Sequence, residues 1–172
     1  MPSLRMEGLV PLSLHDVWRL LWLHLDEETV RAIHPWINGR VVRDEGQVTY
    51  NGLTFPTRHV MEREVRIAGR TLHNTWTYLI APPASFDYEI VGVEGFRSMI
   101  RNAYREEPSG TRIATDAELA IGRLPGFLQR RIAGRLFGRA DAEDLAYLRR
   151  NGFRRAVELA GPPHGSALPK GT

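Results

Sequence analysis

The sequence predicts an α+β fold in which a curved antiparallel sheet of about seven strands wraps around a long C-terminal helix, with two short helices after the first strand. Two observations support this fold. Over residues 57–121, apolar and polar side chains alternate along five strands, and the apolar faces stay together through four turns. Over residues 124–159, apolar side chains recur at helical spacing. We expect one domain over residues 1–160 and a disordered tail over residues 161–172.

The first elements are marked by helix-capping residues. Residues 4–10 are typical of a strand, and Ser13 then stands where a helix N-cap is expected, with Asp16 three residues later. Asp26 is the expected N-cap of a second short helix, which Pro35 ends. The chain therefore returns to the sheet after two short helices.

Turn residues predict how the later strands pair. Gly69 and the residue after it suit a two-residue hairpin turn with glycine first, which places Arg63 opposite Trp76. The last turn places Arg105 opposite Arg112, an unfavourable pair of like charges. The other predicted pairs are Met61 with Tyr78, Tyr78 with Tyr88, Ile80 with Phe86, Ile90 with Ser98, Asn102 with Thr115, and Tyr104 with Ile113.

The inward face of these strands mixes large apolar side chains with a few polar ones. A solid core has no need of such polar groups, whereas a curved sheet that lines a ligand cavity does. We therefore expect a cavity that the terminal helix closes. Its predicted lining is Met61, Arg63, Asn74, Trp76, Tyr78, Tyr88, Phe96, Ile100, Asn102, Tyr104, Thr115 and Phe127.

Arg63 is the strongest single candidate for a binding role. A buried guanidinium without a partner is costly, so an arginine on the apolar face needs one. A ligand carboxylate, phosphate or enolate would serve, with Trp76 stacked on the guanidinium. The alternative is that a local bulge turns Arg63 outward or that its head reaches a rim. His59, on the same face, is a candidate general base, and Tyr78 is a further catalytic candidate.

Composition and motifs exclude several classes of protein. The chain has 172 residues, of which 42% are hydrophobic and 25% charged, as in an ordinary globular domain. It has no cysteine, and hence neither disulfides nor thiol chemistry. The first residues lack the pattern of a signal peptide, so we expect a cytoplasmic protein. The histidines form no metal-binding motif, so we expect no metal, no cofactor and no nucleic-acid partner.

Nearly all of the positive charge comes from arginine, because Lys170 is the only lysine among the 23 basic residues. Arginines are dense over residues 123–155. Such a segment either contacts an anionic surface or is simply a solvated helix face. For an anionic membrane surface, the expected contacts are Arg130, Arg131, Arg149, Arg150, Arg154 and Arg155.

Two segments resemble a known superfamily. Residues 9–21 (LVPLSLHDVWRLL) are similar to the strand, proline and acidic-Val-Trp opening of START-like (SRPBCC) helix-grip proteins of the bacterial polyketide cyclase/dehydrase and lipid-transport type. Residues 119–132 (LAIGRLPGFLQRRI) are similar to the last strand of that fold, which runs through a Pro/Gly turn into the terminal helix. The resemblance implies an apolar tunnel for ligands such as lipids, sterols, polyketides, hormones or quinones.

Three functions fit these patterns, and the first of them is the leading hypothesis. The first is binding or transport of a small hydrophobic ligand that is lipid-like, quinone-like or polyketide-like. The second is a polyketide aromatase/cyclase, in which Arg63 stabilises an enolate while His59 or Tyr78 moves protons. The third is a protein- or ribosome-interaction module that uses the arginine-rich terminal helix. The oligomeric state is not predicted.

Overall fold

The structure is a computed structural model that describes residues 3–67, 69–92, 95–122 and 124–153. One long helix packs on a large sheet. The chain runs through β1 (Ser3–Val10), α1 (Leu14–Leu23), α2 (Glu27–Ile33), β2 (Ile37–Glu45), β3 (Val48–Tyr50), β4 (Leu53–Phe55), β5 (Arg58–Ile67), β6 (Arg70–Ala81), β7 (Ser85–Gly92), β8 (Phe96–Glu107), β9 (Gly110–Ile121) and α3 (Gly126–Asn151).

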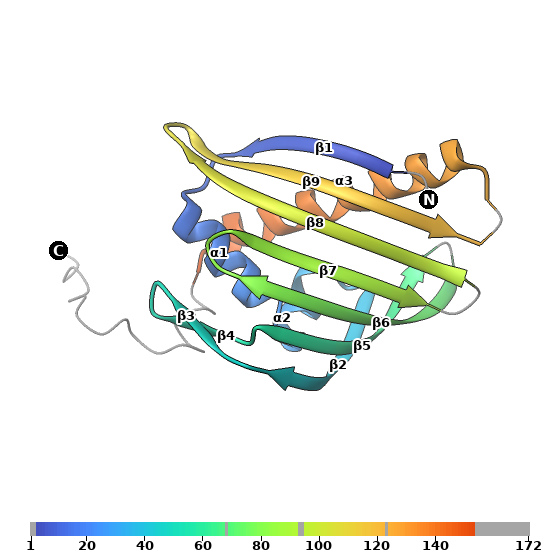
Figure 1. Cartoon of the computed structure of the whole chain (residues 1–172), viewed down its shortest axis with the longest axis horizontal. Coiled ribbons are helices and arrows are strands. Elements are labelled where there is room, and N and C mark those ends of the chain that lie inside the picture. The colour runs from blue at the N-terminus through green and yellow to red at the C-terminus, as the bar shows by residue number, and fades with distance from the viewer. Residues whose placement is uncertain (1–2, 68, 93–94, 123, 154–172) are drawn as a thin grey trace.

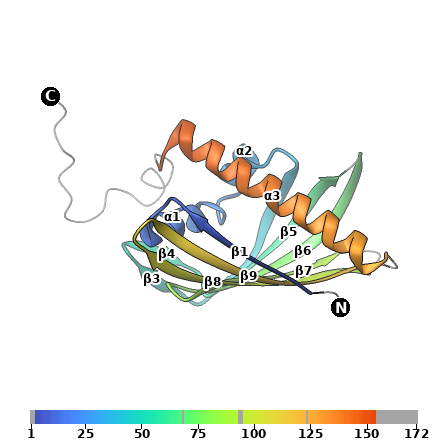
Figure 2. The same cartoon turned by 90° about the horizontal axis from the view of Figure 1, so that it is seen from above.

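Seven strands form one antiparallel sheet in the order β1-β9-β8-β7-β6-β5-β2, and β3 and β4 form a separate small hairpin (Figure 1). The sheet curves, and α3 crosses its concave side, with α1 and α2 beside the C-terminal half of the helix (Figure 2). This arrangement confirms the predicted α+β fold. No helix in the described ranges is long and apolar enough to cross a membrane.

The predicted helix caps are confirmed. The Ser13 side chain accepts a hydrogen bond from the backbone N–H of Asp16 at 3.1 Å, which satisfies one free donor at the start of α1. The Asp26 carboxylate does the same for the N–H of Thr29 at 3.0 Å at the start of α2. These caps set the position of Glu27, the first residue of α2, whose side chain enters the site described below.

The register of the sheet agrees with prediction at three turns and differs at one. Tyr78 pairs with Tyr88, Ile90 with Ser98, and Asn102 with Thr115, as the turns predict. The predicted β5–β6 register was wrong by two residues. The observed pairs are Ile67 with Arg70, Arg63 with Asn74, Met61 with Trp76, and His59 with Tyr78.

Gly69 explains this difference. With φ at +76°, it lies immediately before Arg70 and is the second residue of the turn rather than the first. A shift of two residues keeps every side chain on its predicted face, because side chains alternate along a strand. Arg63 and Trp76 therefore still face inward, as diagonal neighbours.

The terminal helix α3 is continuous from Gly126 to Asn151 and contains Gly134 and Gly138 in its interior. A glycine inside a helix can permit close contact with another backbone. A Cβ atom at either position would meet nothing within 4 Å, so neither glycine permits a close approach. The expected continuation of the helix to residue 159 and the expected tail lie outside the described residues.

The main core forms around Trp18 of α1, which is fully buried. Its ring contacts those of Phe55, Phe86 and Tyr104 at centroid separations of 5.5, 6.1 and 5.5 Å. These contacts fix α1 and the β3–β4 hairpin against one end of the sheet. A second cluster, formed by Leu23, Ile33 and Tyr147, attaches α3 to the two short helices.

The edge strand β2 contains a bulge. Val41 pairs with Met61 and Arg43 with Val60, so Val42 has no partner of its own in the β5 ladder. Val41 and Val42 are both exposed.

Candidate functional site

Arg63 of β5 lies buried beneath α2, with 3% of its surface exposed. Its Nη1 donates to the Tyr78 hydroxyl at 2.5 Å. Its Nη2 donates to Glu27 Oε1 at 3.1 Å and to the backbone carbonyl of His24 at 3.3 Å. The guanidinium carbon lies 4.7 Å from the centroid of the Trp76 ring, so the expected stacking contact is present. Arg63 therefore does not turn outward, and Glu27, which sequence reasoning did not identify, is its ion-pair partner.

Several polar atoms on the inward face have no hydrogen-bond partner among the described residues. Arg63 Nε and Trp76 Nε1 are two such N–H donors on neighbouring strands. Glu27 Oε2 and Ser98 Oγ also lack partners. Buried polar groups in folded proteins nearly always have one. The two buried donors therefore provide a place where a ligand oxygen can accept hydrogen bonds.

An open cleft of about 470 Å³ crosses β2, β5, β6 and β7 at this point, and most of its lining side chains belong to the face of the sheet opposite to the Arg63 side chain. Its lining includes Gly39, Arg63, Asn74 and Gly92, which pair in a row across β2, β5, β6 and β7. The two glycines place no side chain beside Arg63 and Asn74. A Cβ atom at Gly39 would lie 2.6 Å from Glu27 Oε2, and one at Gly92 would lie 2.2 Å from Asn74 Oδ1. Glycine at these positions therefore leaves room for the polar side chains.

Aromatic rings form the next part of the inward face. Trp76 and Tyr88 are stacked, with centroids 5.8 Å apart and planes 2° from parallel. Both rings, and that of Phe96, face the side that α3 covers, yet they are only half-buried. Flat apolar surface is thus available next to the polar group around Arg63.

The phenol of Tyr78 is held in its neutral form. Burial raises its pKa, and the Arg63 charge only partly opposes this. Burial likewise raises the pKa of the Tyr88 phenol well above its ordinary value. Because the Tyr78 oxygen accepts from Arg63, its own proton is available for donation to a ligand.

His59, the candidate general base, is buried on the same inward face, two residues before Met61. Its Nδ1 is hydrogen-bonded to the carboxylate of Asp44 on β2, and its Nε2 has no partner within the described part of the chain. The centroids of the His59 and Tyr78 rings are 5.9 Å apart, and the Tyr78 hydroxyl accepts a hydrogen bond from Arg63. The Asp44 carboxylate orients the His59 ring through Nδ1, and Nε2 is left to accept a proton. This arrangement suits a general base.

Some of the predicted lining residues lie in the filled part of the molecule. Met61 is fully buried against Trp18, and Ile100 is fully buried in a cluster with Ile90 and Ala117. Tyr104 packs on Trp18, which places it in the main core. These side chains support the site from behind.

Three other predicted lining residues, Asn102, Thr115 and Phe127, do not contribute to the group around Arg63. Asn102 donates to the carbonyl of Phe86 at 2.8 Å and accepts from Thr115 at 2.7 Å, so both polar side chains have partners. Phe127, near the start of α3, is 65% exposed and is not enclosed. The groups that come together around Arg63 are Asn74, Trp76 and Tyr78, with Tyr88 stacked on Trp76.

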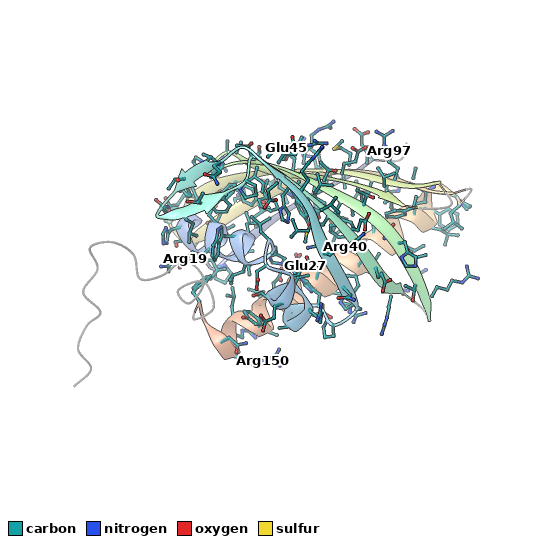
Figure 3. All side chains as sticks on the ribbon, turned by 90° about the horizontal axis from the view of Figure 1, so that it is seen from below. Arg19, Glu27, Arg40, Glu45, Arg97 and Arg150 are labelled. Atoms are coloured by element: carbon teal, nitrogen blue, oxygen red, sulfur yellow. The ribbon has the colours of Figure 1, made fainter. Side chains whose placement is uncertain are left out.

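The described part of α3 carries six arginines, four of which were expected to contact an anionic membrane surface. Arg130 and Arg131 lie near its start, and Arg149 and Arg150 near its end, which at the rise of an α-helix is a separation of about 28 Å. All four are exposed, and Arg150 projects from the end of the helix (Figure 3). Arg154 and Arg155 lie outside the described residues. Arg135 and Arg139, which are also exposed, lie between these two pairs, so the basic side chains extend along the helix from its start.

A second polar cluster lies behind the cleft, where α3 meets the ends of α1 and α2. His24 Nε2, His34 Nε2 and Asp144 Oδ1 converge there within 4.8 Å of one another. Sequence reasoning missed it because the three side chains come from three separate segments and form no spaced motif. The available signal was that each histidine directly follows the last residue of a short helix.

The comparisons with known proteins concern the fold. No protein-family model matches the sequence, and no curated protein matches it either. Solved structures do match. Ara h 8.0201 superposes with a TM-score of 0.66 at 15% identity, over 87% of this chain and 98% of its own. The Zhui aromatase/cyclase from a Streptomyces species gives 0.55 at 15% identity, over 96% and 98%. A protein from Thermus thermophilus gives 0.58 at 18% identity, over 94% and 100%.

These similarities cover nearly all of each structure, and at such identities they concern the fold alone. They agree with the resemblance found in the opening segment and in the turn into the terminal helix. The chain therefore has the helix-grip fold that this resemblance implies.

Proposed function

We propose that the protein binds a small, mostly apolar molecule that carries an acidic or enolic oxygen, and that Arg63 holds this oxygen. The observation that carries the proposal is the pair of buried donors without acceptors, Arg63 Nε and Trp76 Nε1. A ligand oxygen that accepts from either donor would lie near the Arg63 cation, which strengthens the hydrogen bond. Glu27 neutralises Arg63 when the ligand is absent.

The apolar part of the ligand would lie on the half-buried rings of Trp76, Tyr88 and Phe96. The polar side chains around Arg63, which are Glu27, Asn74 and Tyr78, suit the head of the ligand rather than its apolar part. Lipid-like, quinone-like and polyketide-like molecules all combine such a head with an apolar body. In this proposal the protein is cytoplasmic, and the arginines of α3 bring it to an anionic membrane surface where the ligand is delivered.

Native mass spectrometry of the untagged protein tests binding directly. We expect a stoichiometric apolar passenger, recovered by organic extraction, and its loss in Arg63→Met. Arg40→Met is the matched control, because Arg40 lies on the neighbouring strand with an exposed side chain paired to Glu62. A passenger retained equally by Arg63→Met and Arg40→Met would contradict the proposed anchor.

Because Arg63→Met leaves Glu27 without its partner, a milder variant keeps the test informative if folding suffers. Trp76→Phe retains the ring and removes only the Nε1 donor. We expect it to weaken binding of the extracted passenger about 10-fold, since a hydrogen bond to a charged acceptor contributes about 1.5–3 kcal/mol. Trp22→Phe is the control, because Trp22 Nε1 donates instead to the carbonyl of Thr54 at 2.9 Å.

A second candidate function is favoured by His59 and Asp44. An aromatase/cyclase could use His59 Nε2 to take a proton from a carbon next to a ketone, while Arg63 stabilises the enolate that forms. One of the structural neighbours is named an aromatase/cyclase, which supports the idea at the level of fold alone. The discriminating experiment compares wild type with His59→Gln on a poly-β-ketone analogue. An enzyme loses ring closure and keeps binding, whereas a binding protein shows no ring closure in either form.

A further inference from the structure

The cluster of His24, His34 and Asp144 has the dimensions of a metal-binding site. His24 Nε2 lies 3.1 Å from Asp144 Oδ1, His34 Nε2 lies 3.2 Å from the same oxygen, and the two nitrogens are 3.4 Å apart. Zinc–nitrogen and zinc–oxygen bonds are about 2.0–2.2 Å long, so the corners of a zinc tetrahedron are about 3.3 Å apart. The three atoms already stand at that separation.

The outer nitrogens of both histidines are committed to other acceptors. His24 Nδ1 lies 2.8 Å from the carbonyl oxygen of Leu20, which can only accept, so Nδ1 carries the proton. His34 Nδ1 lies 2.7 Å from Glu143 Oε2. Histidines that bind a metal almost always donate their other ring proton to a carbonyl or carboxylate in this way. Both imidazoles are thereby oriented with Nε2 toward Asp144.

Glu143 is itself held in place as an acceptor. Its Oε2 accepts from the indole N–H of Trp36 at 2.7 Å, and its Oε1 accepts from Arg139 at 2.8 Å. With these donors on both oxygens, Glu143 is a carboxylate and receives the His34 Nδ1 proton. Glu143 thus acts as a positioning residue for His34.

With both outer protons placed, neutral imidazoles bring two lone pairs to a carboxylate oxygen. Three acceptors at this distance repel unless a proton on a ring nitrogen or a metal ion lies among them. Asp141, one turn earlier on α3, adds a further negative charge that acts on Asp144 and His34. Two imidazoles with one carboxylate are ligands that suit a first-row divalent transition metal.

We propose that His24 Nε2, His34 Nε2 and Asp144 Oδ1 bind a divalent transition metal of the zinc class, with a fourth position left for water or another oxygen. The metal would link α3 to the corner between α1 and α2. It would also lie next to the ligand anchor, because the backbone carbonyl of His24 accepts from Arg63. The inference does not depend on the proposed ligand.

Titration of the full-length, untagged, chelator-treated protein with Zn²⁺ and with Co²⁺ tests the proposal. We expect one Zn²⁺ per chain by calorimetry, a rise in Tm on adding Zn²⁺, and visible Co²⁺ absorption of the kind given by four-coordinate nitrogen–oxygen sites. Asp144→Asn should abolish the rise in Tm. Glu143→Gln should weaken Zn²⁺ binding about 10- to 100-fold, as expected when a group that orients a ligand is lost.

His73→Gln is the matched control, since His73 is an exposed histidine on β6. His164→Gln is a second control for a histidine outside the described residues. If the chelator-treated wild type does not bind Zn²⁺ stoichiometrically, the proposal is overturned. Protonated histidines that donate to Asp144 would then account for the cluster. Zn²⁺ binding that is the same in wild type and in folded Asp144→Asn would overturn it as well. The wild-type titration decides even if a variant fails to fold.

Discussion

At the scale of single residues, Glu107 explains how the sheet tolerates two arginines that face each other. Arg105 and Arg112 pair across β8 and β9, as the turn predicts. Glu107 Oε1 accepts from Arg105 at 2.9 Å and from Arg112 at 2.6 Å, and Oε2 accepts a second bond from Arg112 at 3.0 Å. One carboxylate thus offsets the repulsion that the pairing alone would cause.

This arrangement predicts a pH dependence. Hydrogen bonds from Arg112 and Arg105 lower the pKa of Glu107 from 4.5 to about 2. A carboxyl whose pKa is lowered by folding stabilises the protein above its unfolded pKa, and this contribution is lost as the pH falls toward the folded value. Glu107→Gln should therefore lower stability at neutral pH and flatten the acid dependence between about pH 5 and pH 2.

Urea unfolding at several pH values measures this effect. Glu106→Gln is the control, because Glu106 is an exposed neighbouring residue and its substitution leaves Glu107 and both arginines in place. An acid dependence of equal slope in wild type and Glu107→Gln would contradict the role assigned to Glu107.

Gly39 gives a second prediction at the residue scale. A Cβ atom there would lie 2.7 Å from Arg63 Cγ and 2.8 Å from the backbone oxygen of Glu62, besides its contact with Glu27. Gly39→Ala should therefore lower the free energy of unfolding by about 1–3 kcal/mol and disturb the Arg63–Glu27 pair. Gly8→Ala on the other edge strand meets nothing within 4 Å and should change it by less than about 0.5 kcal/mol. Equal effects of the two substitutions, measured by urea unfolding, would argue against this packing.

At the scale of elements, patterns local to the chain were sufficient for most of the fold. Ser13 and Asp26 mark helix starts because their side chains cap donors a few residues away, and alternation marks the inward face of each strand. The β5–β6 pairing was missed because Gly69 can occupy either position of a two-residue turn, and the two choices leave the same faces inward. Alternation along the strands does not distinguish registers that differ by two residues.

The glycines of α3 give a prediction at this scale. Gly134 and Gly138 lie in the interior of a continuous helix, and an added Cβ would meet nothing at either. Gly134→Ala and Gly138→Ala should each stabilise the protein by about 0.5–1 kcal/mol, because alanine loses less backbone entropy in a helix. Gly152→Ala should do the opposite, since Gly152 follows the helix with φ at +56°. Thermal unfolding followed by circular dichroism measures all three, and destabilisation by both helix substitutions would refute the expectation.

At the scale of the whole molecule, the attachment of α3 is uneven. Of its described residues only Gln129, Ala133 and Tyr147 are fully buried, and Tyr147 lies in the cluster with the two short helices. The hydrogen bonds to His24 and His34 lie in the same half. The C-terminal half therefore has hydrogen bonds to the short helices that oppose its opening, in addition to apolar packing.

Hydrogen exchange should reveal this difference. We expect backbone amides over residues 130–140 to exchange faster than those over residues 143–148, and both to exchange faster than the amides of β8. Binding of a ligand beneath the helix should slow exchange in the first range most. Uniform exchange along α3, measured by mass spectrometry, would contradict an opening that starts at one end.

The sequence predicted only part of the candidate site, because several of its contacts form when separate elements pack together. Arg63 and Trp76 were found because a charged residue on an apolar strand face stands out in the sequence. Glu27 was not, because its contact with Arg63 depends on how α2 packs on the sheet. The same is true of His34 and Asp144, which are 110 positions apart and meet only when α3 docks. The fold is encoded in local periodicity, whereas these contacts arise from packing between elements.

The bulge in β2 has a consequence for self-association. An outermost strand that offers a straight row of free N–H and C=O groups invites a strand from another molecule to join it. The extra valine interrupts that row, and the cations at Arg40 and Arg43 flank the interruption. Removing Val42 would restore a regular border, and the shortened chain would then be expected to form intermolecular β-structure at high concentration.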